Sequence, residues 1–272
     1  MKKKDDLRSA GEKTFLEHLE ELRFVFLKSF LALMIFTGLG FVFAPAIIKM
    51  LVWPLDRVLQ LSGAVGTADG ILRTLRPTGG FMVGLKAAFL FGIVVSLPFI
   101  LYFFAKFLVP GLTGKERRVV VPSFLMSFML FLGGASFCYF VILPFALKFF
   151  WNYSARLGIR NDWIIENYVS FTVQFLVAFG LVFEIPCVVL ALVKVGILSH
   201  RTLRRNRKFA IVAVFVLAAA VTPTPDIITQ ILVAGPMLAL YELCVWAAKI
   251  VEGKKTGEDA PEINFGNKDL KG

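Results

Sequence analysis

The stretch that most constrains the fold runs from Val169 to Val193, because it is apolar apart from small hydroxyls, Gln174 and one carboxylate, Glu184. A helix of about 20 such residues crosses the ~30 Å hydrocarbon core of a bilayer. An ionised acid at that depth is costly unless it finds a partner, a proton or water. We therefore expect Glu184 to face protein or a wet cavity and to be functional. The alternative is a protonated, hydrogen-bonded carboxyl that only helps helices pack.

The remainder of the chain repeats this apolar pattern. Of its 272 residues 57% are hydrophobic and only 18% are charged, which is typical of a polytopic membrane protein. We predict one all-α membrane domain over residues 1–248, with a capping box from Thr14 to Glu17 opening an amphipathic surface helix. The predicted elements are this surface helix at 14–23, six spans at about 24–48, 81–105, 119–147, 168–193, 209–222 and 227–248, and a disordered tail at 249–272. The segment between the first two spans is expected to form an ordered cap.

Two features refine this topology. The fifth run, from Phe209 to Thr222, extends only ~21 Å as a helix, which is shorter than the hydrocarbon core. With six spans and a cytoplasmic N-terminus, 22 of the 30 Lys and Arg residues fall on the cytoplasmic side, as the positive-inside rule requires. We therefore expect both termini in the cytoplasm. The net charge of +11 is spread over short clusters between the spans, which favours anionic lipids over nucleic acid as its counterpart.

Enzymatic chemistry finds little support in the sequence. Hydrolase, P-loop, zinc-protease and paired dinucleotide-binding motifs are absent. The two histidines, His18 and His200, are far apart, and Cys138, Cys187 and Cys244 lie in apolar runs without metal-ligand spacing. We expect neither catalysis nor a cofactor nor a metal ion. No cleavable signal peptide is expected at the charged start of the chain.

A few carboxylates stand out against the basic cytoplasmic side. They precede the first and third spans, at Glu17, Glu20, Glu21 and Glu116. A carboxylate held by helices accepts two parallel hydrogen bonds from Arg but not from Lys, so such a cluster is a suitable receptor for guanidinium groups. Each acid taken alone is better explained by an ion pair with a neighbour, for example Glu20 with Arg23 or Glu116 with Arg117.

Other function classes remain open on these residues. In a secondary transporter of a small solute, Glu184 would carry a coupling proton while proline-broken helices line the site. In a purely structural membrane scaffold, Glu184 would only help the helices to pack and would have no role in transport.

Several motifs in order distinguish these alternatives. They are His18 to Arg23 (HLEELR), Ser96 to Tyr102 (SLPFILY), Phe107 to Leu112 (FLVPGL), Glu116 to Arg118 (ERR), Phe179 to Pro186 (FGLVFEIP) and Thr222 to Asp226 (TPTPD). With these motifs the sequence resembles the TatC family, the receptor subunit of the twin-arginine protein translocase, from Phe15 to Ala248. The resemblance implies a concave six-helix fold that thins the membrane locally, in agreement with the short fifth run.

The resemblance also implies functional residues. In the family, the acids that correspond to Glu21 and Glu116 are associated with recognition of the signal peptide's arginine pair, and the buried acid of span four corresponds to Glu184. Further positions that match the family are Arg23, Phe107 and Pro98 for signal-peptide binding, Tyr139 together with Glu184 for polar or partner contacts within the membrane, and Pro54 and Asp226. The family often has a second basic residue two places after Arg23, where this chain has Val25.

On this basis we expect a non-enzymatic subunit of the bacterial inner membrane. It would bind twin-arginine signal peptides of folded precursors, assemble with TatA- and TatB-like single-span proteins and with copies of itself, and use the proton-motive force for export.

Overall fold

The computed structural model describes residues 15–62, 67–108, 114–222 and 227–258. Nearly all of them are helical, which confirms the predicted all-helical membrane class. The elements in order are α1 (Phe15–Val42), α2 (Ala44–Leu61), α3 (Ala68–Ile71), β1 (Leu72–Arg73), α4 (Gly79–Leu108), α5 (Gly114–Phe137), the π-helix η3 (Cys138–Ile142), α6 (Leu143–Arg156), β2 (Trp163–Ile164), α7 (Ile165–Val195), α8 (His200–Arg205), α9 (Arg207–Val221) and α10 (Ile227–Glu258).

Within the described residues, five helical stretches are long and apolar enough to cross a membrane. They lie in α1, α4, the continuous helix from α5 through η3 to α6, α7 and α10. The predicted fifth run corresponds to α9, whose 15 residues extend about 22 Å. It is too short to count among these five.

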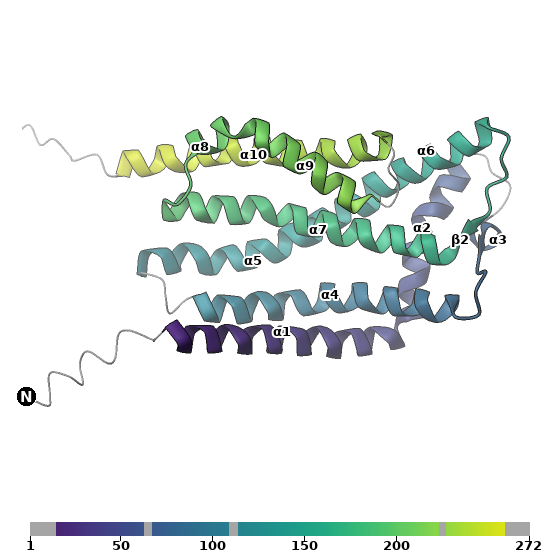
Figure 1. The fold of residues 1–272 in the computed structure, drawn as a ribbon, viewed down its shortest axis with the longest axis horizontal. Helices are drawn as coiled ribbons and strands as arrows, with labels where there is room; N and C mark the ends of the chain where they lie inside the picture. Colours follow the sequence, from purple (N-terminus) through teal and green to yellow (C-terminus); the bar gives the residue numbers. More distant parts are fainter. Residues whose placement is uncertain (1–14, 63–66, 109–113, 223–226, 259–272) are drawn as a thin grey trace, which may run out of the picture.

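The long helices lie side by side, α9 runs along α10, and α2 and α3 lie at one end of the molecule (Figure 1). α4 packs between α1 and α7, α5 packs against α7, and α10 packs against α7 and α9. α2 runs across the ends of the long helices where α4 and α7 begin. The first turn of α1 and the last turns of α10 are both at the opposite end, on opposite sides of the molecule. We refer to these as the α2 end and the α1 end.

The first helix differs from its prediction. Residues 15–23 do not form a separate surface helix but are the first turns of α1, which continues unbroken to Val42. The reason is local, because no proline or glycine precedes Gly38 in this helix. The chain turns only after Val42, and α2 then starts with Pro45 in its first turn, where proline is favoured. Thr14, the expected N-cap, lies outside the described residues.

Two other helices are longer than predicted. The third span continues through η3 and α6 to Arg156, so the first nine residues of the expected wet segment, 148–156, are helical. α10 continues to Glu258, so the predicted disordered tail cannot begin at residue 249. In this extension the Glu252 carboxylate accepts a hydrogen bond from the backbone N–H of His200 at 2.6 Å, which ties α10 to the start of α8.

The main buried cluster lies at the α2 end, where one face of α2 packs against η3, α6 and the first half of α7. Its fully buried members include Leu51, Leu55, Leu143, Val169 and Phe175. A short parallel pairing of β1 with β2 and a salt bridge of 3.8 Å between Arg73 and Asp162 join the two loops beside it. This cluster is the ordered cap that the sequence predicts between the first two spans.

Candidate functional site

The candidate signal-peptide residues come from three helix ends. The N-terminal end of α1, the C-terminal end of α4 and the N-terminal end of α5 all lie at the α1 end of the molecule (Figure 1). Glu21 is half-buried near the start of α1, and Phe107 is half-buried in the last turn of α4. Glu116 belongs to the first turn of α5, and its side chain lies outside the described residues. The fold thus gathers the segments that carry these three residues.

Not every predicted position joins them. Arg23 is exposed on α1, one turn beyond Glu20. Pro98 is exposed in α4, ten residues before Leu108, and therefore about 15 Å along the helix from that end. Its neighbour Phe99 stacks on Phe36 of α1, with ring centroids 5.2 Å apart. Pro98 therefore lies apart from the residues at the α1 end. Val25, at the family's second basic position, is buried, and Asp226 lies outside the described residues.

Glu184 lies on the line of contact between α5 and α7, eleven residues before Val195 and so about 16 Å from the end of α7. Its Oε2 atom accepts a hydrogen bond from the buried Ser127 hydroxyl of α5. One turn further along α7, Cys187 Sγ contacts the Ser123 carbonyl oxygen at 3.2 Å. The prediction that Glu184 faces protein agrees with this position.

Glycines bring these two helices close enough for the contact. A Cβ atom on Gly134 of α5 would lie 2.6 Å from the Phe179 carbonyl oxygen of α7. A Cβ atom on Gly180 of α7 would lie 2.5 Å from the Phe131 ring of α5. Small residues that allow close backbone approach are typical of helix pairs in membranes. The sequence analysis did not identify either glycine, although both lie at helical spacing from Ser127 or Glu184.

The second carboxylate oxygen of Glu184 has a different environment. Glu184 Oε1 is buried and has no hydrogen-bond partner among the described residues. A buried oxygen without a donor is costly, and the cost is larger where water is excluded. The carboxyl group can therefore accept a hydrogen bond from a donor on another helix, or carry a proton.

Two further residues that match the family, Pro54 and Tyr139, are linked through one hydrogen bond to the backbone of α2. Pro54 lies inside α2 and has no N–H group, so the carbonyl of Met50, four residues earlier, loses its helical donor. The Tyr139 hydroxyl of η3 donates to that carbonyl oxygen at 2.6 Å. The Tyr139 ring also stacks on Trp53, with centroids 5.8 Å apart. Tyr139 therefore supports α2 at its proline.

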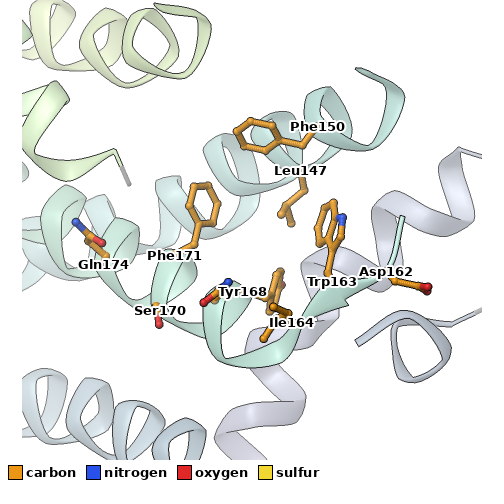
Figure 2. Close-up of a pocket in the computed structure, with 10 residues that line it drawn as sticks. Leu147, Phe150, Asp162, Trp163, Ile164, Tyr168, Ser170, Phe171 and Gln174 are labelled. Atoms are coloured by element: carbon orange, nitrogen blue, oxygen red, sulfur yellow. The ribbon is translucent and has the colours of Figure 1, made fainter. Parts of the chain in front are cut away.

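Sequence reasoning missed a parallel contact and a polar group. The Tyr168 hydroxyl of α7 donates to the Leu51 carbonyl oxygen at 2.7 Å, next to the Tyr139 contact. Lys86 of α4 donates to the Ser170 hydroxyl of α7. Ser170 also borders a hollow of about 620 Å³ beside α6 and α7, in which Phe150, Phe171 and Trp163 form apolar walls (Figure 2). A lysine inside an apolar run was the available signal for this region.

Comparison with known proteins identifies the family. Residues 17–236 match the family model described as Sec-independent protein translocase protein (TatC). The Sec-independent protein translocase protein TatC of Akkermansia muciniphila is 43% identical over 215 residues, which are 77% of this chain and 62% of that protein. The TatC protein of Carboxydothermus hydrogenoformans is 36% identical over 89% of this chain and 95% of that protein.

The structural comparison agrees. A crystal structure described as the twin-arginine translocase receptor TatC superimposes with a TM-score of 0.74 at 36% identity, over 87% of this chain and all of that chain. A second structure, of TatC in the detergent DDM, gives a TM-score of 0.75 over 85% of this chain. The family match covers the segments that carry Glu21, Glu116 and Glu184, together with both tyrosine contacts to α2. The chain therefore belongs to the TatC family of Sec-independent protein translocase proteins.

Proposed function

We propose that this chain is the receptor and core subunit of a twin-arginine translocase, which binds twin-arginine signal peptides at its cytoplasmic face. The observation that carries the proposal is the gathering of the Glu21 and Glu116 segments at one end of a TatC fold. A signal peptide would place one guanidinium on each carboxylate, with paired hydrogen bonds that lysine cannot form. Its apolar segment would then lie along the helices towards Glu184.

The topology that goes with this proposal has six spans and both termini in the cytoplasm. α9 is the fifth of these spans in chain order, and its apolar part is short enough to require local thinning of the bilayer. The α1 end is then cytoplasmic and the α2 end faces outwards. The excess of Lys and Arg on the cytoplasmic side supports this orientation.

Glu184 has a role within the membrane in this proposal. TatA- and TatB-like single-span proteins would pack against the receptor, and a polar group on one of them would donate to Glu184 Oε1. The buried and unpartnered state of this oxygen in the described residues supports the assignment. Copies of the receptor, its partners and surrounding anionic lipids would together form the passage, with the proton-motive force as the energy source.

The docking step is tested by crosslinking. A photo-crosslinking residue at Leu22 reports the neighbourhood of Glu21, and a twin-arginine precursor is compared with one in which both arginines are lysines. We expect the lysine pair to reduce crosslinking about tenfold, which corresponds to about 1.4 kcal/mol. Glu21→Ala should reduce crosslinking of the arginine form to the same level.

The matched control is Glu20→Ala, which removes an exposed carboxylate one position away on a different face of α1. It should leave crosslinking unchanged. Equal crosslinking of the arginine and lysine precursors would contradict the proposed carboxylate recognition.

A further inference from the structure

Two adjoining hollows border the first half of α7 at the α2 end. The larger, of about 620 Å³, lies against α6, and the smaller, of about 420 Å³, lies against α4. Both include Ser170 and Gln174, so they meet along α7 (Figure 2). Most of their surface is apolar, with Phe89 and Val177 in the smaller hollow and Phe171 in the larger one. This shape fits hydrocarbon chains.

The polar groups in these hollows have few partners. Lys86 Nζ donates to Ser170 Oγ, and Ser170 Oγ in turn donates to the Glu166 carbonyl oxygen at 2.5 Å. The Glu166 carboxylate instead accepts from the Thr74 hydroxyl at 2.8 Å. Among the described residues, no carboxylate forms an ion pair with Lys86, and the exposed Gln174 carboxamide has no hydrogen bond. The Lys86 ammonium thus borders the hollows without a carboxylate partner, and the Gln174 carboxamide borders them without a hydrogen-bond partner, among the described residues.

The depth of these groups makes the missing partners expensive. Lys86 lies about 10 Å into α4, counted from Gly79, and Gln174 lies about 14 Å into α7, counted from Ile165. Trp163, which lines the larger hollow and precedes α7, packs edge to face with Trp151, and such aromatic rings mark the lipid headgroup level. Polar groups below that level need a partner, because little water reaches them.

We propose that these hollows bind one phospholipid of the leaflet at the α2 end, with its phosphate on Lys86. We choose a lipid because of the order in which charged, polar and apolar groups follow one another along α7. An ammonium comes first, a carboxamide follows about one turn deeper, and beyond it the smaller hollow is lined by Val177, Ala178 and Leu181. A phospholipid presents its phosphate, its ester carbonyls and its hydrocarbon in the same order. The Gln174 amide donates to an ester carbonyl, and the acyl chains lie along the apolar lining of the smaller hollow beyond Gln174.

This proposal does not depend on the signal-peptide site, and its test needs only the purified full-length chain. Native mass spectrometry in detergent measures retention of three probes, namely phosphatidylglycerol, diacylglycerol and inorganic phosphate. Diacylglycerol offers the chains and esters without the phosphate, and inorganic phosphate offers the charge alone. We expect one phosphatidylglycerol per chain, retained at about tenfold lower concentration than diacylglycerol, and no retention of inorganic phosphate.

Variants localise the binding. Lys86→Ala should weaken phosphatidylglycerol retention about tenfold while leaving diacylglycerol unaffected, because only the phosphate contact is lost. Gln174→Leu should weaken both lipids about threefold, since both carry ester carbonyls. It changes an exposed side chain, so it also tests the site if Lys86→Ala fails to fold. The controls Lys148→Ala and Gln60→Leu, both at exposed positions at the α2 end outside the hollows, should bind like the unchanged chain.

The proposal is overturned if phosphatidylglycerol and diacylglycerol are retained equally, or if Lys86→Ala or Gln174→Leu binds phosphatidylglycerol like the unchanged chain. A photo-crosslinking residue at Val177, used in membranes, separates a lipid from a protein occupant. An adduct with lipid is expected there. An adduct with a protein helix in place of lipid would also overturn the proposal.

Discussion

Helices α1 and α7 have similar lengths of 28 and 31 residues and similarly apolar sequences, yet they have opposite environments. α7 packs against α4, α5 and α10, and its first half also contacts α2. α1 packs almost entirely against α4, and its other faces carry large exposed apolar side chains such as Phe30, Met34 and Leu39. Apolar composition therefore indicates that a helix lies in the membrane, but not what surrounds it.

The difference also separates two kinds of stabilisation. α7 is fixed by glycine-mediated close approach to α5 and by hydrogen bonds from Tyr168 and to Glu184. α1 is fixed along one line of contact with α4, which includes ring pairs such as Phe36 with Phe99. Gly40 also approaches α4 closely, since a Cβ atom added to it would lie 2.8 Å from the Ala88 carbonyl oxygen. Substitutions along α7 should therefore cost much more stability than substitutions on the open faces of α1.

The largest effect is expected for Gly134→Leu, on the contact of α5 with α7. The new side chain would collide with the Phe179 carbonyl oxygen and the Phe183 ring, and backbone cannot move aside cheaply. We expect a loss of about 3 kcal/mol in the free energy of unfolding, measured in detergent. Gly133→Leu is the matched control, because a Cβ atom there meets nothing within 4 Å. Equal losses in the two variants would contradict the close approach of the two helices.

A smaller effect is expected for Tyr139→Phe, which removes the donor to the Met50 carbonyl beside Pro54. We expect a loss of about 1 to 2 kcal/mol in the free energy of unfolding, since a buried carbonyl is left without a partner. Pro54→Ala restores an N–H group four residues after Met50. In that background Tyr139→Phe should cost at least about 0.5 kcal/mol less. Additive losses would show that the proline and the tyrosine are independent.

Ser127→Ala should have a more modest effect on the α5–α7 contact. It removes the hydroxyl that donates to Glu184 and leaves the carboxyl with no donor among the described residues. Hydrogen bonds between membrane helices average about 0.6 kcal/mol, so we expect a loss of about 0.6 to 1.5 kcal/mol in the free energy of unfolding. Ser136→Ala, at an exposed position of the same helix, provides the comparison and should change little.

The smallest effect is expected on the open side of α1. Phe30 is 61% exposed, so Phe30→Ala should change the free energy of unfolding in detergent by less than about 0.5 kcal/mol. A loss above about 2 kcal/mol would show that another molecule, such as a second copy of the chain, covers this face in detergent. Such a result would remove the contrast between α1 and α7.

The sequence was a good guide to the helices and to the family, because both depend on local patterns. Apolar runs interrupted by charge predicted each long helix, and several separate motifs predicted TatC membership, which the comparisons confirm. Helix ends were less predictable. α6 continues to Arg156, and its contacts with α2 and the edge-to-face pair of Phe150 with Phe171 of α7 join residues far apart in the sequence. α10 continues to Glu258, and its Glu252 carboxylate contacts a backbone N–H 52 residues away.

Long-range pairings could not be predicted from the sequence, because they depend on how helices far apart in the chain pack together. The role of Glu184 in the membrane was inferred from its depth, but Ser127 as its donor depends on the register of α5 against α7. Pro54 and Tyr139 were both selected, but not as one contact. Lys86 interrupts the apolar run of α4 in the sequence, but its contact with Ser170 connects residues 84 positions apart. The roles proposed for Glu21 and Glu116 are still predictions.

The support of α2 by two tyrosines has a consequence for biosynthesis. The hydroxyls that satisfy Met50 and Leu51 come from residues 89 and 117 positions later in the chain. When α2 leaves the ribosome, neither donor has been translated, so the Met50 carbonyl, which Pro54 leaves without a helical N–H donor, can be satisfied only by water at the membrane surface. α2 therefore acquires its final position late, after α7 has begun to emerge, and nascent chains truncated before Tyr139 should leave it accessible to added protease.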